Sequence, residues 1–369
     1  MTPSKLHGLL HAVVAPLLVA AAVFLLYVQV DNRGFSDPVW APHVAASVIY
    51  DGDPFLDEFR EWVEAFGHFA TFERDGHLHS YFPLGGPLLT IPATLVMDAV
   101  MPPLRGVTLQ AYLVAHAPTD PAVLRIQLIN ASLLVALSAG VMYLVAREYL
   151  SVLYALLLTA TYAFATPAYS TASRMLWQHG PSMLMLSLVL LLLVRARRRP
   201  GLIPYIALPL AAAFIIRPTN SLSVLLVTAY VALHYRRYLL RYLLFAALLA
   251  APFVWINLRL YGGILPPYFA VNRLGLPPTL GEALLGNLVS PGRGLFIFSP
   301  VLLLVPAGVL ARARRRQLGL LEWTLIAIIL LHWLVISAFI QWTAGHSFGP
   351  RFFADVLPYM VFFLIPILE

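Results

Sequence analysis

The side chains that could carry chemistry in this sequence are few, and most stand between long apolar runs. Asp37 lies in the segment GFSDPVW, seven residues after the first apolar run ends at Val30. If that run spans a membrane, the carboxylate lies at the surface and could act as a general base toward an acceptor hydroxyl or amine. The Asp-Pro pair also has a structural interpretation, because Asp is a common N-cap and Pro a common first helical residue.

Three arginines stand beside glycine, proline or the start of an expected helix. Arg217 precedes Pro218, Arg293 lies in SPGRGLF, and Arg351 lies in GHSFGPRFF. Free backbone N–H groups at a helix start, together with a guanidinium, form a site for an anion such as phosphate. Each arginine could instead contact a lipid headgroup or pair with a carboxylate, as Arg351 could with Asp355 four residues later. Three such arginines in a charge-poor chain favour a lipid-linked phosphate as the ligand.

Two histidines are further candidates. His346 stands five residues before Arg351, and His179 lies in RMLWQHGPS close to Arg174. Either imidazole could hydrogen-bond a phosphate or act as an acid. Either could equally be a histidine of the membrane interface.

A group of acidic residues surrounds a Gly-Asp-Pro turn. Asp51, Asp53 and Asp57 could bind a divalent cation through oxygen, although their spacing matches no specific ion-binding loop. The favoured interpretation is that these carboxylates and Glu58 form the solvated face of a helix. The sequence therefore predicts neither a metal nor another cofactor.

The composition identifies the kind of scaffold that must position these residues. The chain has 369 residues, of which 60% are hydrophobic and 11% charged, and its mean hydropathy is +0.81; an average soluble domain is about 25% charged. A soluble enzyme, a disordered chain and a disulfide scaffold are excluded, and the absence of cysteine excludes a thiolate nucleophile. No HExxH, P-loop or dinucleotide motif is present. We expect an all-α, polytopic transmembrane bundle that forms one domain over residues 1–369.

A bilayer core of about 30 Å needs about 20 apolar residues for each helix, and fewer where flanking residues reach the interface. The chain offers about ten such runs, at 9–30, 122–145, 150–169, 181–194, 202–216, 221–233, 242–257, 295–310, 320–340 and 356–368. An eleventh run, 84–101, is interrupted by glycine and proline, and we expect it to lie in the interface. The basic clusters at 195–199, 236–241 and 312–316 then fall on the cytoplasmic side with Lys5 and Arg147. The +7 net charge therefore reflects topology and does not indicate nucleic-acid binding.

This topology puts the N-terminus in the cytoplasm, places the chain in the inner (plasma) membrane and makes residues 31–121 one long outer loop with interfacial helices. Ten of the 17 acidic residues fall between residues 31 and 75. Within that loop, the aromatic residues of 55–70 have roughly helical spacing, which predicts an amphipathic helix lying on the bilayer. His332 is the only ionisable residue deep in an expected span, and we interpret it as a packed, hydrogen-bonded histidine.

Three regions in this order resemble the GT-C glycosyltransferases. The nearest likeness is to the bacterial, family-39-like relatives of the protein O-mannosyltransferases and aminoarabinose transferases. The regions are SDPVWAPHVAASVIYDGDPFLDEF, GHLHSYFPLGGPLLTIP, and SPGRGLFIFSPVLLL together with GHSFGPRFFADVLP. The resemblance implies transfer of a sugar from a polyprenyl-phosphate carrier to a glycan, lipid or protein acceptor at the outer face of the membrane.

The resemblance also implies roles for individual residues. It makes Asp37 the candidate base and Asp57 a second catalytic candidate. The candidates for binding the donor phosphate are Arg217, Arg293, Arg351 and His346, and the accessory candidates are His179, Arg174 and Glu58. Relatives often carry Asp where this chain has Gln178 and His179, and many continue beyond the position of Glu369.

Two other classes of function remain open. The first is a non-catalytic membrane subunit that keeps the GT-C-like fold and contributes packing or lipid binding to a larger complex. The second is a transporter or flippase of lipid-linked sugar. The second is disfavoured because the spans are almost uncharged and would offer no polar path across the membrane.

Overall fold

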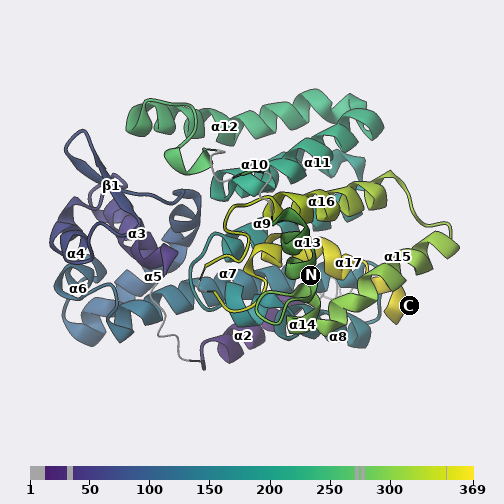
Figure 1. The fold of residues 1–369 in the computed structure, drawn as a ribbon, viewed down its shortest axis with the longest axis horizontal. Coiled ribbons are helices and arrows are strands. Elements are labelled where there is room, and N and C mark those ends of the chain that lie inside the picture. Colours follow the sequence, from purple (N-terminus) through teal and green to yellow (C-terminus); the bar gives the residue numbers. More distant parts are fainter. Residues whose placement is uncertain (1–12, 31–35, 271–273, 276–278, 346) are drawn as a thin grey trace, which may run out of the picture.

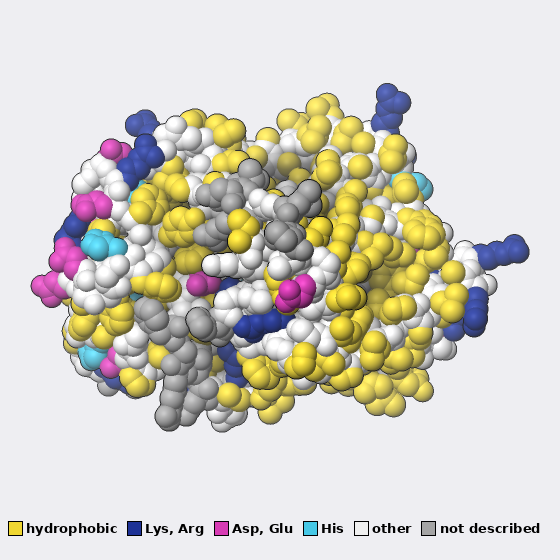
Figure 2. All heavy atoms as spheres, viewed as in Figure 1, with side chains coloured by type: hydrophobic (Ala, Val, Ile, Leu, Met, Phe, Trp, Pro, Cys, Tyr) yellow, Lys and Arg dark blue, Asp and Glu magenta, His cyan; other side chains and the backbone are white. Residues whose placement is uncertain are grey.

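The structure is a computed structural model that describes residues 13–30, 36–270, 274–275, 279–345 and 347–369. It is mostly helical, as the sequence predicts. Figure 1 shows a body of helices that run roughly along the long axis, with a smaller lobe around α3, α4, α6 and the β-hairpin at one end. On the face drawn in Figure 2, hydrophobic side chains cover much of the half away from the lobe; acidic side chains gather over the lobe, and basic side chains project at the opposite end.

Four of the described helices are long and apolar enough to cross a membrane, which indicates a membrane protein. They are α7 (Pro121–Arg147), α9 (His179–Ala196), the η7–α12 unit (Arg236–Tyr261) and α16 (Leu320–Ser337). The shorter apolar helices are α2 (Ala15–Tyr27), α8 (Val152–Phe164), the η5–α10 unit (Pro200–Ile216) and α13 (Leu280–Val289). The helix α11 (Ser221–His234) packs against α16 and α10.

Local sequence explains why these helices begin and end where they do. The α7 helix starts with an Asp-Pro pair, in which the Asp120 carboxylate accepts a hydrogen bond from the Ala122 N–H at 2.8 Å. The apolar run 295–310, expected as one span, is broken at Pro300 into α14 (Leu295–Phe298), η10 (Pro300–Leu303) and α15 (Leu304–Arg314). Proline lacks the N–H group that a continuous helix would need there.

The run 356–368 is also interrupted, into α17 (Leu357–Phe362) and α18 (Ile365–Leu368). Before it lies the 3₁₀-helix η11 (Arg351–Val356). Buried residues of α7, α9, α10 and α17 form much of the main hydrophobic core. In contrast, only 6% of the most apolar window of the η7–α12 unit is buried, so this helix presents its leucines outward, as a lipid-facing helix does.

The lobe is formed by residues of the expected outer loop and has its own hydrophobic core. Its elements are η2 (Asp37–Trp40), α3 (Ala41–Tyr50), η3 (Asp57–Phe59), α4 (Arg60–Ala65), β1 (Thr71–Arg74), β2 (His77–Ser80), α5 (Gly85–Arg105) and α6 (Leu109–Ala115). The antiparallel strands pair Thr71 with Ser80 and Arg74 with His77. Asp75 and Gly76 both have positive φ at the turn, as the short Asp-Gly hairpin turn requires. This hairpin is a departure from the all-α prediction.

The expected amphipathic helix over 55–70 is wrong in extent. The α-helix ends at Ala65, and Gly67, His68 and Ala70 have positive φ, which no α-helix accommodates. Phe59 and Val63 are fully buried in the core of the lobe. The apolar side of this short helix therefore packs against protein.

The ambiguous run 84–101 forms the N-cap and most of the continuous helix α5, which begins at Gly85 and is not among the four span candidates. A Cβ atom at Gly85 would lie 2.9 Å from the Cα of Ile216, so glycine allows the start of α5 to approach the end of α10. This contact joins the lobe to the body immediately before Arg217.

Candidate functional site

The structure brings Asp37 together with Arg351, which lies 314 residues further along the chain. The Asp37 Oδ2 atom accepts a hydrogen bond from Arg351 Nη1 at 3.2 Å, and 38% of the Asp37 side chain is exposed. Asp37 is the first residue of η2 and Ser36 holds the N-cap position, so the N-cap interpretation of Asp37 is wrong. The carboxylate is therefore held by a guanidinium from the far end of the sequence and remains open to solvent.

Arg351 is the more enclosed partner of this pair. Its side chain is 11% exposed, and its guanidinium lies 5.1 Å from the ring centroid of Trp177 and 5.6 Å from that of Phe352. Burial lowers the pKa of Arg351, and the neighbouring Asp37 carboxylate opposes that shift. Within the described residues, its Nε–H group has no hydrogen-bond partner. Arg351 thus keeps a buried donor that an anionic ligand could use.

Arg217 is directed toward a different carboxylate. Its Nε atom lies 2.6 Å from Asp355 Oδ2, and the two side chains are 5% and 0% exposed. The alternative of an ion pair between Arg351 and Asp355 is therefore wrong. The physical reason is that η11 is a 3₁₀-helix with about three residues per turn, which turns residues four apart away from one another. The positive charge of Arg217 is used to neutralise a buried anion.

His179 completes this buried network. Its Nδ1 atom lies 3.2 Å from Asp355 Oδ1, at the start of α9. Burial would raise the pKa of Asp355, but Arg217 and His179 hold it well below its usual range, so the carboxyl group is ionised. His332 lies nearby and pairs its Nε2 atom with the Phe352 carbonyl oxygen at 2.8 Å, which confirms its interpretation as a hydrogen-bonded, packed histidine. These groups fix the position of η11, from which Arg351 projects.

Arg293 organises the loop that precedes η11. Its guanidinium donates hydrogen bonds to the backbone carbonyl oxygens of Gly345, Ser347 and Gly349. Gly349 has a φ of 66° and lies against the ring of Phe298. Arg293 therefore positions the chain leading to Arg351. The phosphate-site candidate His346 lies outside the described residues.

Arg174 is held by backbone carbonyl groups and by the Ser173 hydroxyl. Its side chain donates to the carbonyl oxygens of Tyr169 at 2.8 Å and Tyr27 at 3.2 Å, and its guanidinium lies over both rings. Burial lowers its pKa, and the two tyrosines oppose that shift. These contacts attach the loop before α9 to the end of α2.

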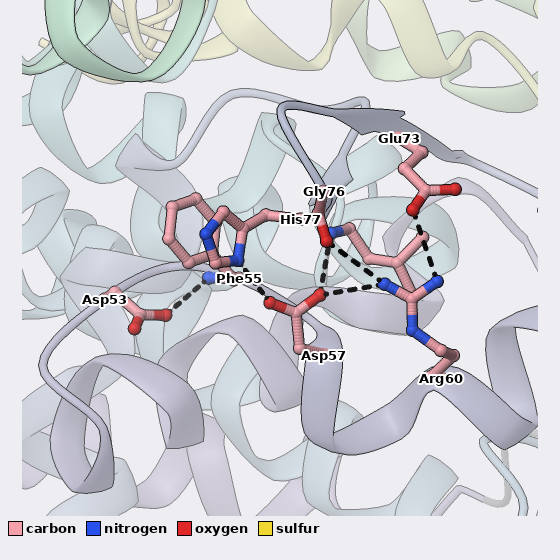
Figure 3. A network of polar contacts seen from close by, with 8 residues as sticks. Asp53, Phe55, Asp57, Arg60, Glu73, Gly76 and His77 are labelled. Atoms are coloured by element: carbon pink, nitrogen blue, oxygen red, sulfur yellow. Dashed lines mark hydrogen bonds and ion pairs between the residues drawn. The ribbon is translucent and has the colours of Figure 1, made fainter.

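Asp57 belongs to the lobe and acts there as a hairpin anchor (Figure 3). Its carboxylate lies 2.6 Å from His77 Nδ1, accepts from the Leu78 N–H at 2.8 Å, and pairs with Arg60 at 3.4 Å. Burial favours a higher pKa for Asp57, but the hydrogen bonds from His77 and Leu78 lower it overall. Phe55 stacks on His77 with ring centroids 4.2 Å apart. The structure therefore gives Asp57 a structural role in joining η3 to β2.

The neighbouring acidic residues are engaged separately. Asp53 accepts from the Phe55 N–H at 3.0 Å, and Asp51 accepts from Gln110 Nε2 at 2.6 Å. Glu58 lies largely at the surface. The burial of its remaining part and the carboxylates of Asp51, Asp53 and Asp57 raise its pKa. Over the described ranges, no three or more His, Asp and Glu side chains are grouped so that they could hold a metal ion.

Three aromatic side chains that the sequence analysis did not single out lie near the Asp37–Arg351 pair. We call Tyr81, Phe82 and Tyr268 the aromatic wall. Tyr81 and Phe82 of the YFPLGG segment pack against Tyr268, with ring centroids 5.7 and 5.2 Å from it. The Tyr268 phenol is close enough to Arg351 to affect its pKa. Aromatic faces of this kind pack against apolar surfaces and against the C–H faces of rings. The signal in the sequence was the run of aromatic residues in two segments that are both expected at the outer face.

His43 is a second residue that the sequence analysis missed. It is fully buried between the rings of Trp40 and Phe59, whose centroids lie 5.2 and 4.7 Å away. Neither ring nitrogen makes a hydrogen bond of normal geometry in the part of the chain that the structure describes, although the Val39 backbone is close enough to oppose the pKa shift. Burial lowers the pKa of His43 to about 3. The imidazole is thus kept neutral in the core of the lobe.

This burial makes the stability of the protein depend on pH. An unfolded histidine takes up a proton below about pH 6.5, whereas folded His43 does so only near pH 3. Folding therefore loses stability as the pH falls between these values, by up to about 1.4 kcal/mol per pH unit. We expect His43→Leu to reduce the measured loss but not to abolish it, because burial lowers the pKa of His179 to about 3 as well; the measurement is thermal unfolding of the purified protein between pH 7 and 4. His234→Leu, at an exposed histidine, is the control, and an equal pH slope in both variants would contradict the assignment.

Comparison of the chain with protein-family models, with curated proteins and with solved structures finds no match. The site therefore rests on its own geometry. In that geometry the partly exposed carboxylate of Asp37 lies beside Arg351, which is mostly buried and has an N–H group without a partner among the described residues. The aromatic wall completes the site.

Proposed function

We propose that the protein transfers a sugar from a polyprenyl-phosphate donor to an acceptor at the outer face of the inner membrane. In this proposal the N-terminus is cytoplasmic, about ten segments span the membrane, and the lobe is the outer loop. The observation that carries the proposal is the pairing of Asp37 with Arg351 beside the lobe. A base and an anion-binding group then stand next to each other, as displacement of a phosphate by a hydroxyl requires.

The reaction can be written with these two residues. The acceptor hydroxyl oxygen attacks the anomeric carbon of the sugar, and the bond between that carbon and the phosphate oxygen breaks. The bonding electron pair leaves with the lipid phosphate, whose charge Arg351 stabilises. The proton of the hydroxyl passes to Asp37. The resemblance described above implies inversion at the anomeric carbon by this single displacement.

The Asp37–Arg351 ion pair also suggests the order of events. With no donor bound, the two side chains neutralise each other. A donor phosphate competes with Asp37 for the guanidinium and can also accept from the buried Arg351 Nε–H. Donor binding thus frees the carboxylate to act as a base. Arg293 and the Arg217–Asp355 pair serve in this scheme to hold the loop and η11 in place.

The alternative is a non-catalytic membrane subunit with a GT-C-like fold. It is favoured by the internal engagement of Arg217 and Arg293, which leaves Arg351 as the one of the three predicted arginines that faces Asp37. The nearly unburied apolar η7–α12 unit would then contact another subunit. Stoichiometric copurification with other membrane proteins, without binding of a polyprenyl phosphate, would support this alternative.

The proposal is tested by supplying the reconstituted protein with a panel of polyprenyl-phosphate sugars. Release of free polyprenyl phosphate, dependent on added acceptor, is the expected result. Binding of unglycosylated polyprenyl phosphate can be measured in parallel as a shift in thermal unfolding. Failure of every donor both to bind and to react would contradict the proposal.

Arg351→Gln should weaken binding of polyprenyl phosphate by about 10- to 100-fold, because a hydrogen bond to a charged group contributes about 1.5–3 kcal/mol. Arg351→Lys should restore part of the affinity, since it returns the charge without the two-pronged geometry. The measurement is a titration of lipid into purified protein. Arg293→Lys is not a suitable control because Arg293 holds the same loop. We therefore choose Arg125→Gln, at another arginine close to the lobe, on helix α7. Equal affinities of the Arg351→Gln variant and the unaltered protein would rule out Arg351 as a phosphate ligand.

A further inference from the structure

A second group of arginines lies at the other end of the body from Asp37. The helix α9 begins at His179, within the site, and ends at Ala196, so its 18 residues separate the two ends by about 27 Å. Beyond Ala196 follow Arg197, Arg198 and Arg199. Here the α7–α8 connection, the end of α9, α15 and the start of α16 meet.

A partly enclosed cavity of about 140 Å³ opens at this meeting point. Its lining residues are Glu148, Tyr149, Val194, Arg197 and Arg198. The walls thus combine two guanidinium groups, one carboxylate and one phenol. Such a cavity has the size and the donors to take a phosphate group.

The charges around the cavity do not balance. Glu148 pairs with Arg195 at 2.8 Å and with Arg198 at 3.3 Å. The fully buried Glu322 pairs with Arg197 and, at 3.8 Å, with Arg312. With Glu369, which pairs with Arg315 at 2.7 Å and also acts on Arg312, five guanidinium groups share three carboxylates, which leaves an excess of two positive charges in this region.

The positive charge of Arg312 is only partly compensated by neighbouring groups. Its side chain is 3% exposed, and its guanidinium lies over the rings of Phe362 and Tyr149, 4.5 and 5.5 Å from their centroids. Its Nε and Nη2 groups find no hydrogen-bond partner among the residues described. A buried cation without a full set of partners is costly, so an anion bound in the cavity, which Tyr149 also lines, would be stabilised.

We propose that this cavity binds the phosphate headgroup of an anionic phospholipid. Arg197 and Arg198 would donate to the phosphate oxygens, and Tyr149 lines the same cavity. A lipid fits better than free phosphate because α8 starts directly after this wall and exposes Leu153, Leu156 and Leu157, along which acyl chains can lie. Basic pockets between helices at a membrane surface are a general means of binding anionic headgroups. The proposal is independent of the sugar-transfer reaction.

The experiment compares the purified protein in nanodiscs of phosphatidylcholine with and without phosphatidylglycerol, and separately with inorganic phosphate. Native mass spectrometry should show phosphatidylglycerol retained on the protein, while inorganic phosphate should bind much more weakly. Arg198→Gln should lower lipid retention by about tenfold, the loss expected for one charge-assisted hydrogen bond. This residue is chosen because its side chain is 76% exposed and its loss leaves Glu148 paired with Arg195.

The matched control is Arg236→Gln, which removes the same charge from an exposed arginine that does not line the cavity. Unchanged retention in this control, with loss in Arg198→Gln, supports the site. Equal loss in both variants would reduce the effect to general surface charge and overturn the proposal. Binding of inorganic phosphate as strong as that of phosphatidylglycerol would overturn the assignment to a lipid.

Discussion

Asp37→Asn is expected to lower the rate of sugar transfer by about 10²- to 10⁴-fold, the usual contribution of a positioned general base. The amide is nearly the same size as the carboxylate, and its carbonyl oxygen can still accept the hydrogen bond from Arg351. It cannot take up the proton of the acceptor hydroxyl. The donor should therefore still bind while transfer is lost. The measurement is release of polyprenyl phosphate by the reconstituted protein, together with donor affinity.

The control for this experiment is Asp75→Asn. Asp75 occupies the exposed hairpin turn with a φ of 53°, which asparagine also adopts readily. The Asp75→Asn substitution removes one acidic charge from the lobe. It should leave the rate of sugar transfer within a factor of about two of that of the unaltered protein, because surface substitutions usually have small effects. If the protein turns over a lipid-linked sugar and Asp37→Asn reacts at the full rate, Asp37 is not the base.

Asp355→Asn is expected to lower the free energy of unfolding by about 3–5 kcal/mol, the cost of leaving one member of a buried ion pair without its partner. Arg217 is 5% exposed and cannot reach water without moving the segment that joins α10 to α11. The same substitution weakens the contact of His179 with η11. The measurement is thermal or chemical unfolding in detergent, with Asp75→Asn again as the control.

A second variant separates the ion pair from general damage to the core. Replacing both partners, as Arg217→Met with Asp355→Leu, removes the unpaired charge and should recover much of the lost stability. Because the pKa of Asp355 is depressed in the fold, its contribution to stability is complete above the unfolded value of about 3.9 and is lost as the pH falls through the lower folded value. A cost of Asp355→Asn no greater than that of Asp75→Asn would show that the pair contributes little.

Parts of the fold could be predicted from local sequence alone. The long apolar runs that became α7, α9 and α16 needed only their length and composition. The start of α7 was also readable, because the Asp-Pro pair at Asp120 acts through neighbouring backbone groups. The hairpin has a recognisable signal in Asp75-Gly76, which the sequence analysis did not use. The helical spacing of the aromatic residues just before the hairpin reflects burial in the core of the lobe, and periodicity cannot distinguish a helix packed on protein from one lying on lipid.

The pairing of residues in the candidate site could not be predicted from local sequence. Both members of the Asp37–Arg351 pair could be chosen from the sequence, because carboxylates and arginines beside glycine or proline are rare in so apolar a chain. Their pairing could not, since 314 residues separate them and any outer arginine could have been the partner. The rotation of the 3₁₀-helix η11 decided that Arg351 faces Asp37 while Asp355 faces Arg217.

The sequence by itself determined that this chain has apolar helices suited to a membrane, with acidic residues gathered in one segment and arginines in others. Composition and hydropathy are sums over neighbouring residues, so they do not depend on how distant segments meet. Only the tertiary structure decided which charges neutralise one another inside the protein and which retain a free donor or an open face. Pairing energies depend on distance and burial, and both are set by packing between segments far apart in the chain.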